Sequence, residues 1–379
     1  MRFLISPQEF KGSLSAQEAA HAIARGLRRV WPEAELDVAP MADGGPGTVA
    51  AVLSARGGRP QKTVVSDPLG RPVEAAWALL DDGPAAVIEM AAASGLVLLR
   101  PEELDPRRTT TRGTGELIRT ALDAGCRRLT VGVGGSATND GGAGMAQALG
   151  ARLLDERGRD LPPGGAALAR LSHIDVSGLD ARLADVRAQV ATDVTSPLCG
   201  DLGASRVYGP QKGATPEVVE ELEAALCRYA EIVRRDLGVD IVNMPGAGAA
   251  GGLGGGLVAF LKAEVRPGGE FVAEAIGLRE RMRRADVVLT GEGRLDRQTG
   301  FGKTVATVAR MAKEEGRPVI ALVGGVEPEA VARPGIDAVL SIVSRPMTLA
   351  EAIAEAAELL EAAAARAAAL VRSGSLPRR

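Results

Sequence analysis

The sequence predicts an α/β protein with two domains. Apolar runs bounded by turn residues alternate with helical segments at both ends of the chain, which is the pattern of a parallel sheet covered by helices. The middle of the chain carries strands joined by a short Pro-Gly turn, which indicates a mixed sheet, and the 379 residues exceed the usual size of a single core. We therefore expect a Rossmann- or flavodoxin-like parallel-sheet domain formed by residues 1–62 and 284–379. A second, mixed α/β domain of residues 63–283 is expected to be inserted into it.

The N-terminal segment predicts a strand, a helix and a second strand in succession. Residues 2–6 (RFLIS) form a buried apolar run, and residues 15–31 form a helix in which Ser15 and Glu18 have the spacing of a capping box. Residues 35–39 (ELDVA) form the next strand, which ends at the glycine-rich loop PMADGGPGT. This order is the beginning of a βαβ fold.

The middle segment predicts further strands and one long helix. Residues 62–81 contain two strands joined by the Pro-Gly turn, and residues 85–90 (AAVIEM) add another. Residues 128–135 form a strand that leads into a glycine-rich loop and a helix, and residues 186–198 form a strand that ends in polar residues. Residues 216–237 predict a long charged helix.

The C-terminal segment returns to strict alternation of strands and helices. Strands are predicted at residues 285–296, 318–325 and 336–343. Helices are expected to begin near Gly302, Pro328 and Thr348. The last helix, rich in Ala, Glu and Arg, is expected to cover the sheet.

Charge and hydropathy exclude several classes of function. The net charge is −3 and the pI about 5.7, without a basic arm, so we expect no nucleic-acid partner. No apolar run approaches the roughly 20 residues that cross a bilayer, and the opening MRFLIS is too short for a signal-peptide core, which predicts a cytoplasmic protein without a membrane partner. The oligomeric state is left open.

The cysteines and histidines argue against thiol, zinc and Ser-His chemistry. Cys126, Cys199 and Cys227 lie far apart in the sequence, so neither a disulfide framework nor a thiolate metal site is indicated. The two histidines, His21 within a predicted helix and His173 beside a predicted strand, are expected to be structural.

Lysine and asparagine are rare, which marks the few that are present. There are 39 arginines but only six lysines, and ammonium and guanidinium groups are not interchangeable. Three lysines are next to glycine, namely Lys11, Lys212 and Lys303, and Asn139 is one of only two asparagines.

The stretch GVGGSATNDGGAGMAQALGA, residues 132–151, follows a predicted strand and precedes a predicted helix. Gly132, Gly134 and Ala137, with Asp155 about 20 residues further on, match the spacing of a dinucleotide fingerprint. A tight strand-to-helix turn explains the same glycines equally well, because glycine is abundant in this chain. The third interpretation is an anion site, in which backbone N–H groups from Gly134, Gly135 and Ser136 bind phosphate or carboxylate, with Asn139 as a further donor.

Two other loops follow strands and carry charged residues. In TGEGRLDRQTGFGKT, Gly291 closes an apolar strand, while Glu292 and Asp296 are acids suited to magnesium. The Gly-Lys-Thr at Lys303 lacks the earlier glycine of a P-loop. Lys11 precedes the first helix, where it can neutralise a bound anion.

Two further residues suit transfer of a phosphoryl group. Asp193 lies just past a predicted strand and can accept the proton of a substrate hydroxyl, although helix capping is the more common role for such a residue. Lys212 lies in the loop YGPQKGAT. Together these loops favour handling of a small anion and a nucleotide over hydride transfer or hydrolysis.

Nine motifs in order resemble the bacterial glycerate kinase family, over essentially the whole chain from Arg2 to about Val343. They are FKGSLS, MADGG.GT, EMAAASGL, TTTRGTGELI, GVGGSATNDGGAGMAQALGA, ATDVTSPLCG, GPQKGAT, GAGAAGGLGGGL and TGEGRLDRQT..GK. The resemblance implies ATP-dependent phosphorylation of D-glycerate, usually at the 2-hydroxyl, with Mg²⁺, in a cleft between two α/β domains. The residues that fall on family-pattern positions are Lys11, Asp43, Ser136, Asn139, Asp140, Asp193, Lys212, Glu292, Asp296 and Lys303.

Roles for these residues follow from their chemistry. We expect Lys11 and glycine-loop amides to hold the glycerate carboxylate and Asp193 to accept the hydroxyl proton. Glu292 or Asp296 is expected to position Mg²⁺ on the ATP phosphates, while Lys303 and Lys212 stabilise charge on the transferring group.

The chain departs from the family pattern at two places. Gln8 and Glu9 follow Pro7 where the family usually has Asp-Ser, and Pro46 stands where the loop usually has an acid. These departures favour one alternative, a protein of the same fold that binds nucleotide or hydroxy acid without turnover. The dinucleotide match keeps a second alternative, an NAD-dependent dehydrogenase.

Overall fold

The structure is a computed structural model that describes residues 1–295, 303–327 and 335–374. It divides into two compact units: unit 1 contains Met1–Ala42 and the chain from Gly269 onward, and unit 2 contains Asp43–Gly268. The α/β fold class with two domains is confirmed.

These boundaries differ from the predicted ones, after residues 62 and 283, because flanking helices have their partners elsewhere. Helix α2 (Thr48–Arg56) belongs to unit 2, where the Val49 N–H donates to Glu89 Oε1 at 2.7 Å. Helix α10 (Leu278–Arg284) belongs to unit 1, where Arg281 forms an ion pair with Asp37.

Unit 1 is built on a five-stranded, fully parallel sheet in the order β13-β12-β11-β1-β2. The strands are β1 (Arg2–Ile5), β2 (Glu35–Val38), β11 (Val287–Leu295), β12 (Val319–Val326) and β13 (Ala338–Ser341). Numbered within the unit, the order is 2-1-3-4-5, which is the flavodoxin-like arrangement. The order reverses between β1 and β11, where such folds bind ligands at the carboxyl ends of the strands.

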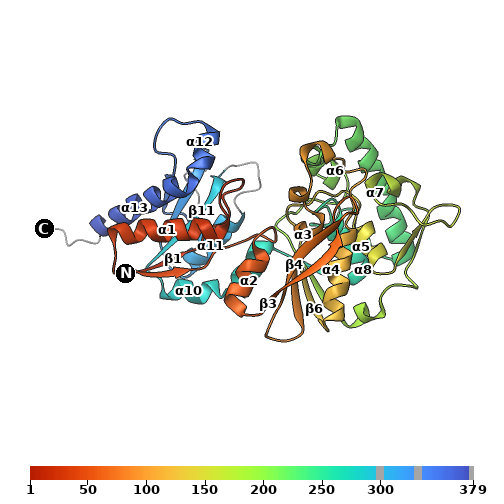
Figure 1. The fold of residues 1–379 in the computed structure, drawn as a ribbon, viewed down its shortest axis with the longest axis horizontal. Coiled ribbons are helices and arrows are strands. Elements are labelled where there is room, and N and C mark those ends of the chain that lie inside the picture. The colour runs from red at the N-terminus through yellow and green to blue at the C-terminus, as the bar shows by residue number, and fades with distance from the viewer. Residues whose placement is uncertain (296–302, 328–334, 375–379) are drawn as a thin grey trace. The chain divides into compact units, whose positions relative to one another are not determined.

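Helices cover both faces of this sheet (Figure 1). The helices of unit 1 are α1 (Ala16–Val30), α9 (Gly268–Ala275), α10, α11 (Lys303–Glu314), α12 (Leu349–Ala354) and α13 (Ala356–Gly374). Phe3 and Ile5 of β1 pack in one core with α1 and α13, whereas Ala321 and Val323 of β12 pack with Val305 of α11 in another. Side chains alternate between the faces of a strand, so the apolar runs of β1 and β12 supply two cores at once.

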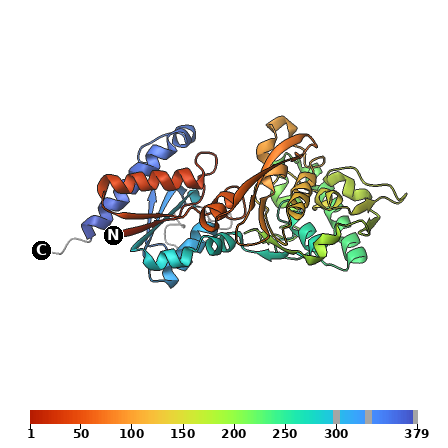
Figure 2. The same cartoon turned by 60° about the horizontal axis from the view of Figure 1, so that its bottom comes forward.

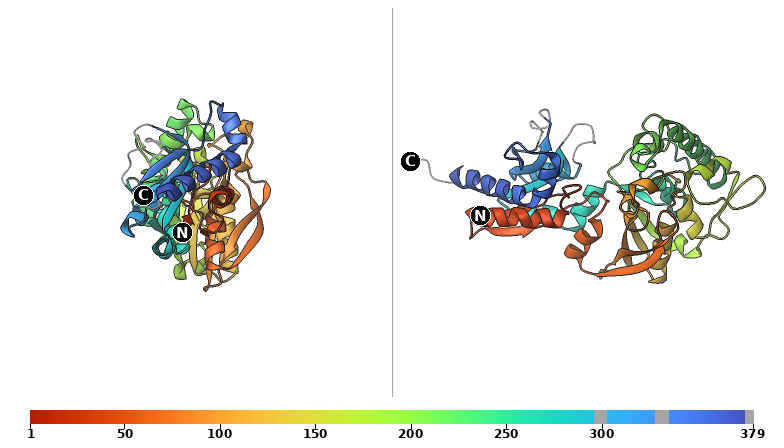
Figure 3. Two further views of the ribbon diagram at one scale, coloured as in Figure 1. Left: turned by 90° about the vertical axis from the view of Figure 1, so that its left-hand side faces the viewer. Right: turned by 45° about the horizontal axis from the view of Figure 1, so that its top comes forward.

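Helices α1 and α13 lie side by side, as Figures 1 and 3 show. Ser15 caps α1 through the predicted capping box with Glu18. A Cβ atom at Gly26 would lie 2.2 Å from the carbonyl oxygen of Glu361, so glycine allows the two backbones to approach. The last helix therefore covers the sheet by packing on the first.

Unit 2 is built on a six-stranded mixed sheet in the order β10-β9-β6-β5-β4-β3. The strands are β3 (Arg59–Ser66), β4 (Pro72–Leu79), β5 (Ala85–Glu89), β6 (Arg128–Gly132), β9 (Arg187–Ala191) and β10 (Glu264–Arg266). Strands β5, β6, β9 and β10 are parallel, and β3 and β4 form the antiparallel hairpin predicted around the Pro-Gly turn, orange in Figure 2. A small separate sheet pairs β7 (Arg152–Leu154) with β8 (His173–Asp175).

One large apolar core joins this sheet to its helices. The helices of unit 2 are α2, α3 (Ala91–Ser94), α4 (Arg112–Asp123), α5 (Ala143–Ala148), α6 (Ala204–Tyr208), α7 (Pro216–Leu237) and α8 (Leu253–Leu261). Trp77 of β4, Leu117 of α4 and Tyr229 of α7 are almost fully buried members of the core.

Most predicted elements are confirmed, including α7 at its predicted bounds. Helices α2, α4 and α8 were missed, as were the shorter helices α3, α6, α9 and α10. The glycine-rich sequence of α8 lacks a clear helical period, whereas α4 has an apolar face that was not recognised in the sequence. The helix expected near Pro328 lies outside the described residues. No helix in the described part of the chain is long and apolar enough to cross a membrane.

Replacement of Gly26 tests the contact between α1 and α13. We expect Gly26→Ala to lower the free energy of unfolding by about 1–3 kcal/mol, since the added methyl group meets the Glu361 carbonyl and Ala364 Cβ at 2.7 Å. The measurement is urea unfolding. Gly374→Ala, where no atom lies within 4 Å of the added Cβ, is the matched control. Equal stability of both variants would contradict the close approach.

Candidate active site in the strand-end loops

The parallel strands of unit 2 end in one row of residues. Glu89 of β5 is paired in register with Gly132 of β6, Gly132 with Ala191 of β9, and Ala191 with Arg266 of β10. The loop that carries Gly134, Gly135, Ser136, Asn139 and Asp140 and the loop that carries Asp193 leave the sheet at this edge. Glu89 and Arg266 lie in the same row and were missed, because the sequence does not show that their strands end together.

The loop of residues 43–48 packs on this edge through glycine. The Gly134 N–H donates to the Gly44 carbonyl at 3.1 Å. A Cβ atom at Gly132 would lie 2.3 Å from that carbonyl oxygen, and one at Gly44 would lie 2.1 Å from the oxygen of Ala191. Asp43, partly buried at the start of the loop, accepts a hydrogen bond from the Gly45 N–H at 3.0 Å.

The predicted anion loop keeps two of its three amides available. The Gly134 N–H is occupied by the bond to Gly44, whereas the N–H groups of Gly135 and Ser136 donate to no other protein group in the described chain. Gly135 has a φ of 76°, which favours glycine. Its carbonyl accepts from the Leu96 N–H at 3.0 Å, so the segment is held in place from the other side.

Asn139 lies inside the protein. It is fully buried, and its Nδ2 donates to Ser205 Oγ on α6 at 3.0 Å. Its Oδ1 is buried without a hydrogen-bond partner among the described residues. Such an oxygen is costly unless a ligand or water donates to it, which is consistent with the predicted role as a polar contact.

Lys212 is also buried, with 1% of its surface exposed. Its Nζ donates to the Thr138 carbonyl at 2.6 Å, and no carboxylate of the described residues lies within ion-pair distance of it. Burial lowers the pKa of Lys212 to about 7, against an opposing effect of the nearby Asp140. Lys212 therefore holds the backbone beside Asn139.

Asp140 has a structural environment. Its carboxylate is fully buried and accepts from the N–H groups of Thr111 at 2.8 Å, Gly142 at 3.1 Å and Gly144 at 3.2 Å, as well as from the hydroxyls of Thr111 and Thr110. Burial raises the pKa of this carboxyl, while these hydrogen bonds favour its charged form. Asp140 connects the start of α4 to the start of α5, and its predicted substrate contact stays a prediction.

Asp193 stands two residues beyond the end of β9 and is partly buried. The preceding Thr192 N–H donates to the Arg266 carbonyl at 3.0 Å, and Thr192 Oγ1 accepts from the Val194 N–H at 3.1 Å. These bonds fix the backbone on both sides of Asp193 at the carboxyl edge of the sheet.

In unit 1 the loop that carries Lys11 lies next to the end of β11, which carries Glu292, at the reversal of strand order. The loop after β1 is tied to β11 by a bond from the Gln8 N–H to the Gly291 carbonyl at 2.9 Å. A Cβ atom at Gly293 would lie 3.3 Å from the backbone nitrogen of Lys11, so the Lys11 loop and the end of β11 are neighbours. Lys11 is exposed and Glu292 is buried.

Gly291 itself is required by packing, because a Cβ there would lie 2.1 Å from the Leu322 carbonyl oxygen of β12. Lys303 is the first residue of α11, and its side chain lies outside the described part of the structure. Asp296 also lies outside the described residues.

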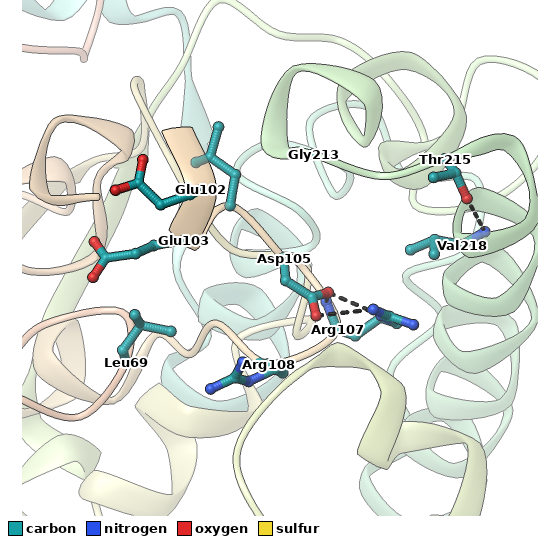
Figure 4. A pocket seen from close by; sticks show the side chains of 10 residues that line it. Leu69, Glu102, Glu103, Asp105, Arg107, Arg108, Gly213, Thr215 and Val218 are labelled. Carbon is teal, nitrogen blue, oxygen red and sulfur yellow. Dashed lines mark hydrogen bonds and ion pairs between the residues drawn. The ribbon is translucent and has the colours of Figure 1, made fainter. Parts of the chain in front are cut away.

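A cavity of about 430 Å³ is present elsewhere in unit 2 (Figure 4). None of the predicted site residues lines it, although Gly213 follows Lys212. Arg107 on its wall is paired with Asp105 at 2.9 Å, and Glu103 is paired with Arg71 and Arg100. The charges of Arg107, Asp105 and Glu103 are thus already compensated within the wall of the cavity.

The dinucleotide interpretation does not fit the sheet. Asp155 follows β7, which pairs only with β8 in the small separate sheet and is not a neighbour of β6. Its carboxylate accepts from the N–H groups of Arg157 and Arg159 in a turn. A dinucleotide fingerprint needs its acid on the strand beside the glycine loop.

Comparison with known proteins agrees with the motif order. The pattern described as "Glycerate kinase family" matches residues 3–372. The chain is 50% identical to the glycerate kinase of Bacillus subtilis strain 168 over 374 residues, 98% of both proteins. It is 49% identical to the glycerate 2-kinase of Escherichia coli K12 over 354 residues, 93% of both.

A solved structure supports the same conclusion. The fold matches the crystal structure of "putative glycerate kinase 2" from Salmonella typhimurium LT2 with a TM-score of 0.84 at 49% sequence identity, covering 99% of both chains. The resemblance drawn from the nine motifs is thus confirmed, and this chain belongs to the glycerate kinase family.

Proposed function

We propose that the protein is an ATP-dependent kinase that transfers the γ-phosphoryl group to the 2-hydroxyl of D-glycerate, giving 2-phosphoglycerate and ADP. The observation that carries the proposal is the match over nearly the whole chain to relatives named glycerate kinase and glycerate 2-kinase. Four of the family motifs lie at the carboxyl ends of parallel strands, those of β1 and β11 in unit 1 and those of β6 and β9 in unit 2, where α/β folds bind small anions.

In unit 2, Asp193 is the proposed general base. It accepts the proton of the attacking hydroxyl, as a carboxylate does in phosphoryl transfer. The N–H groups of Gly135 and Ser136 are proposed to bind an anionic group of a substrate, with Asn139 Oδ1 accepting a hydrogen bond from a hydroxyl. The Gly134 amide is assigned to structure, because Gly44 already occupies it.

In unit 1, Glu292 is proposed to hold Mg²⁺ on the ATP phosphates together with Asp296, which lies outside the described residues. Carboxylate oxygens suit this hard cation, and Glu292 is buried beside the switch between β1 and β11. When bound, Mg²⁺ neutralises charge on the β- and γ-phosphoryl oxygens. Lys11 and Lys303 are proposed to supply further positive charge to bound anions.

Asp140 and Lys212 are proposed as positioning residues. Both are buried and bind loop backbone, which holds Asn139 and the anion loop in one geometry. We further propose that the enzyme acts in the cytoplasm, where ATP is available.

A coupled assay of ADP release tests the function. We expect ADP formation to depend on D-glycerate, ATP and Mg²⁺ together. ATP or glycerate binding without glycerate-dependent ADP would instead indicate the binding protein that Gln8 and Pro46 suggest.

Loss of the base should affect turnover more than binding. We expect Asp193→Asn to lower kcat by roughly 10²–10⁴-fold with a small change in the KM for glycerate. Steady-state kinetics provide the measurement. Asp185→Asn, an exposed acid near the opposite end of β9, is the control and should retain activity. Undiminished kcat in the Asp193 variant would remove it as the base.

Loss of a metal ligand should appear in the magnesium dependence. We expect Glu292→Gln to raise the Mg²⁺ concentration for half-maximal activity by about 10-fold or more, because an amide binds the cation more weakly than a carboxylate. Kinase assays over a Mg²⁺ series measure this. Glu280→Gln, an exposed acid of α10, is the control. An unchanged magnesium curve for Glu292→Gln would contradict the assignment.

The buried lysine predicts a pH effect on stability. Between about 7 and the ordinary value of 10.5, Lys212 is neutral in the folded protein and protonated in the unfolded chain. The unfolded state then binds one more proton, so this residue makes stability rise with pH by up to about 1.4 kcal/mol per unit. Below a pH of about 7, where Lys212 is protonated in both states, the free-energy cost of burying its charge lowers stability in full.

Lys212→Met removes that penalty and also the bond to Thr138. We expect the variant's free energy of unfolding, relative to the wild type, to improve as the pH falls from about 9 to about 6. Urea unfolding at several pH values measures this difference, and exposed Lys313→Met should show no such trend. A difference independent of pH would contradict the lowered pKa of Lys212.

A further inference from the structure

Two of the three cysteines meet in the folded protein. Cys199, Glu223 and Cys227 each offer one ligand atom, and these atoms all lie within 4.8 Å of one another. The sequence spacing gave no sign of this, because the chain leaves β9, forms α6 and only then enters α7. The expectation that no thiolate site exists is therefore open to correction.

Local structure holds the three side chains together. Glu223 and Cys227 are one turn apart on α7, so they project from the same face of the helix. Cys199 lies in the loop after β9, and the next residue, Gly200, donates its N–H to Glu223 Oε1 at 2.5 Å. The loop that begins at Asp193 is thus tied to α7 at the cysteine.

The carboxylate of Glu223 provides a second, independent observation. The side chain is 7% exposed, and its Oε2 has no hydrogen-bond partner among the described residues. The nearby Arg206 forms its hydrogen-bonded ion pair with Glu220 and acts on Glu223 only through its charge. A buried carboxylate oxygen without a donor is costly, and a cation beside it would remove that cost.

We propose that Cys199, Glu223 and Cys227 bind a thiophilic divalent cation of the zinc type, with water as the fourth ligand. Two sulfur ligands and one carboxylate suit tetrahedral Zn²⁺ or Cd²⁺, and thiolates select against Mg²⁺. The bound ion would anchor the end of the loop that starts at Asp193 to α7. The proposal does not depend on the proposed kinase reaction.

Binding requires a change of protonation. Burial raises the pKa of both thiols, and Glu223 and Glu231 add negative charge around Cys227. Both S–H bonds break, two metal–sulfur bonds form and two protons pass to solvent, without any oxidation or reduction.

Titration of the full-length, reduced protein with Cd²⁺ in excess Mg²⁺ tests the site. We expect about one ion per chain, with thiolate-to-cadmium charge-transfer absorption. Cys199→Ala and Cys227→Ala should each weaken binding by more than the roughly 10-fold that loss of an outer-sphere partner costs. Glu223→Gln can still accept the hydrogen bond from the Gly200 N–H. This variant should bind Cd²⁺ more weakly than the wild type but show the same charge-transfer absorption, because both sulfur ligands remain.

Cys126→Ala is the matched control, because Cys126 is buried in the main core and is not part of this cluster. It should bind as the wild type does. The melting temperature is a second readout. Addition of Zn²⁺ should raise it in the wild type and in the control but not in the two cysteine variants.

Two results would overturn the proposal. One is a reduced wild-type protein without charge-transfer absorption or stabilisation by Zn²⁺, including one in which Cys199 and Cys227 only form a disulfide on oxidation. The other is binding that persists in both cysteine variants.

Discussion

The close approach of glycine backbones at the carboxyl edge of the unit 2 sheet is the constraint on which the candidate site depends. Gly44 lies so near Ala191 and Gly132 that a Cβ at either glycine would overlap a carbonyl oxygen. This contact places the loop that starts at Asp43 against the ends of β6 and β9, from which the anion loop and Asp193 emerge. The glycines are therefore needed for packing, whether or not the loop binds an anion as proposed.

The second layer of the site is a buried polar network. Asp140 accepts hydrogen bonds from N–H and hydroxyl groups at the starts of two helices, and Lys212 donates to the Thr138 carbonyl. Interior polar groups that are satisfied in this way hold a loop in one conformation. Asn139 lies between them with an amide oxygen that no described protein group satisfies, which makes it the member of the network best suited to contact a ligand.

Sequence reasoning succeeded where the signal is local. The capping box of Ser15 and Glu18, the β3–β4 hairpin and helix α7 depend on residues close together in the chain. Order along the chain also identified the family, because nine motifs in series are specific even though none is decisive alone. Three features depend on contacts between residues far apart in the chain, for which the sequence carries no periodic signal. They are the hydrogen bond that occupies the Gly134 N–H, the row of strand ends from Glu89 to Arg266, and the proximity of Cys199 to Cys227.

The central claim is that the strand-end loops of this protein direct phosphoryl transfer to the 2-hydroxyl of D-glycerate. Nuclear magnetic resonance of the product formed from D-glycerate and ATP tests it most directly, since the coupling of phosphorus to neighbouring carbon and hydrogen nuclei reports both turnover and the position of the new bond. The account predicts a single product with phosphorus coupled to the C2 position. Phosphorus at C3, or unaltered D-glycerate after prolonged incubation with folded protein, ATP and Mg²⁺, would contradict it.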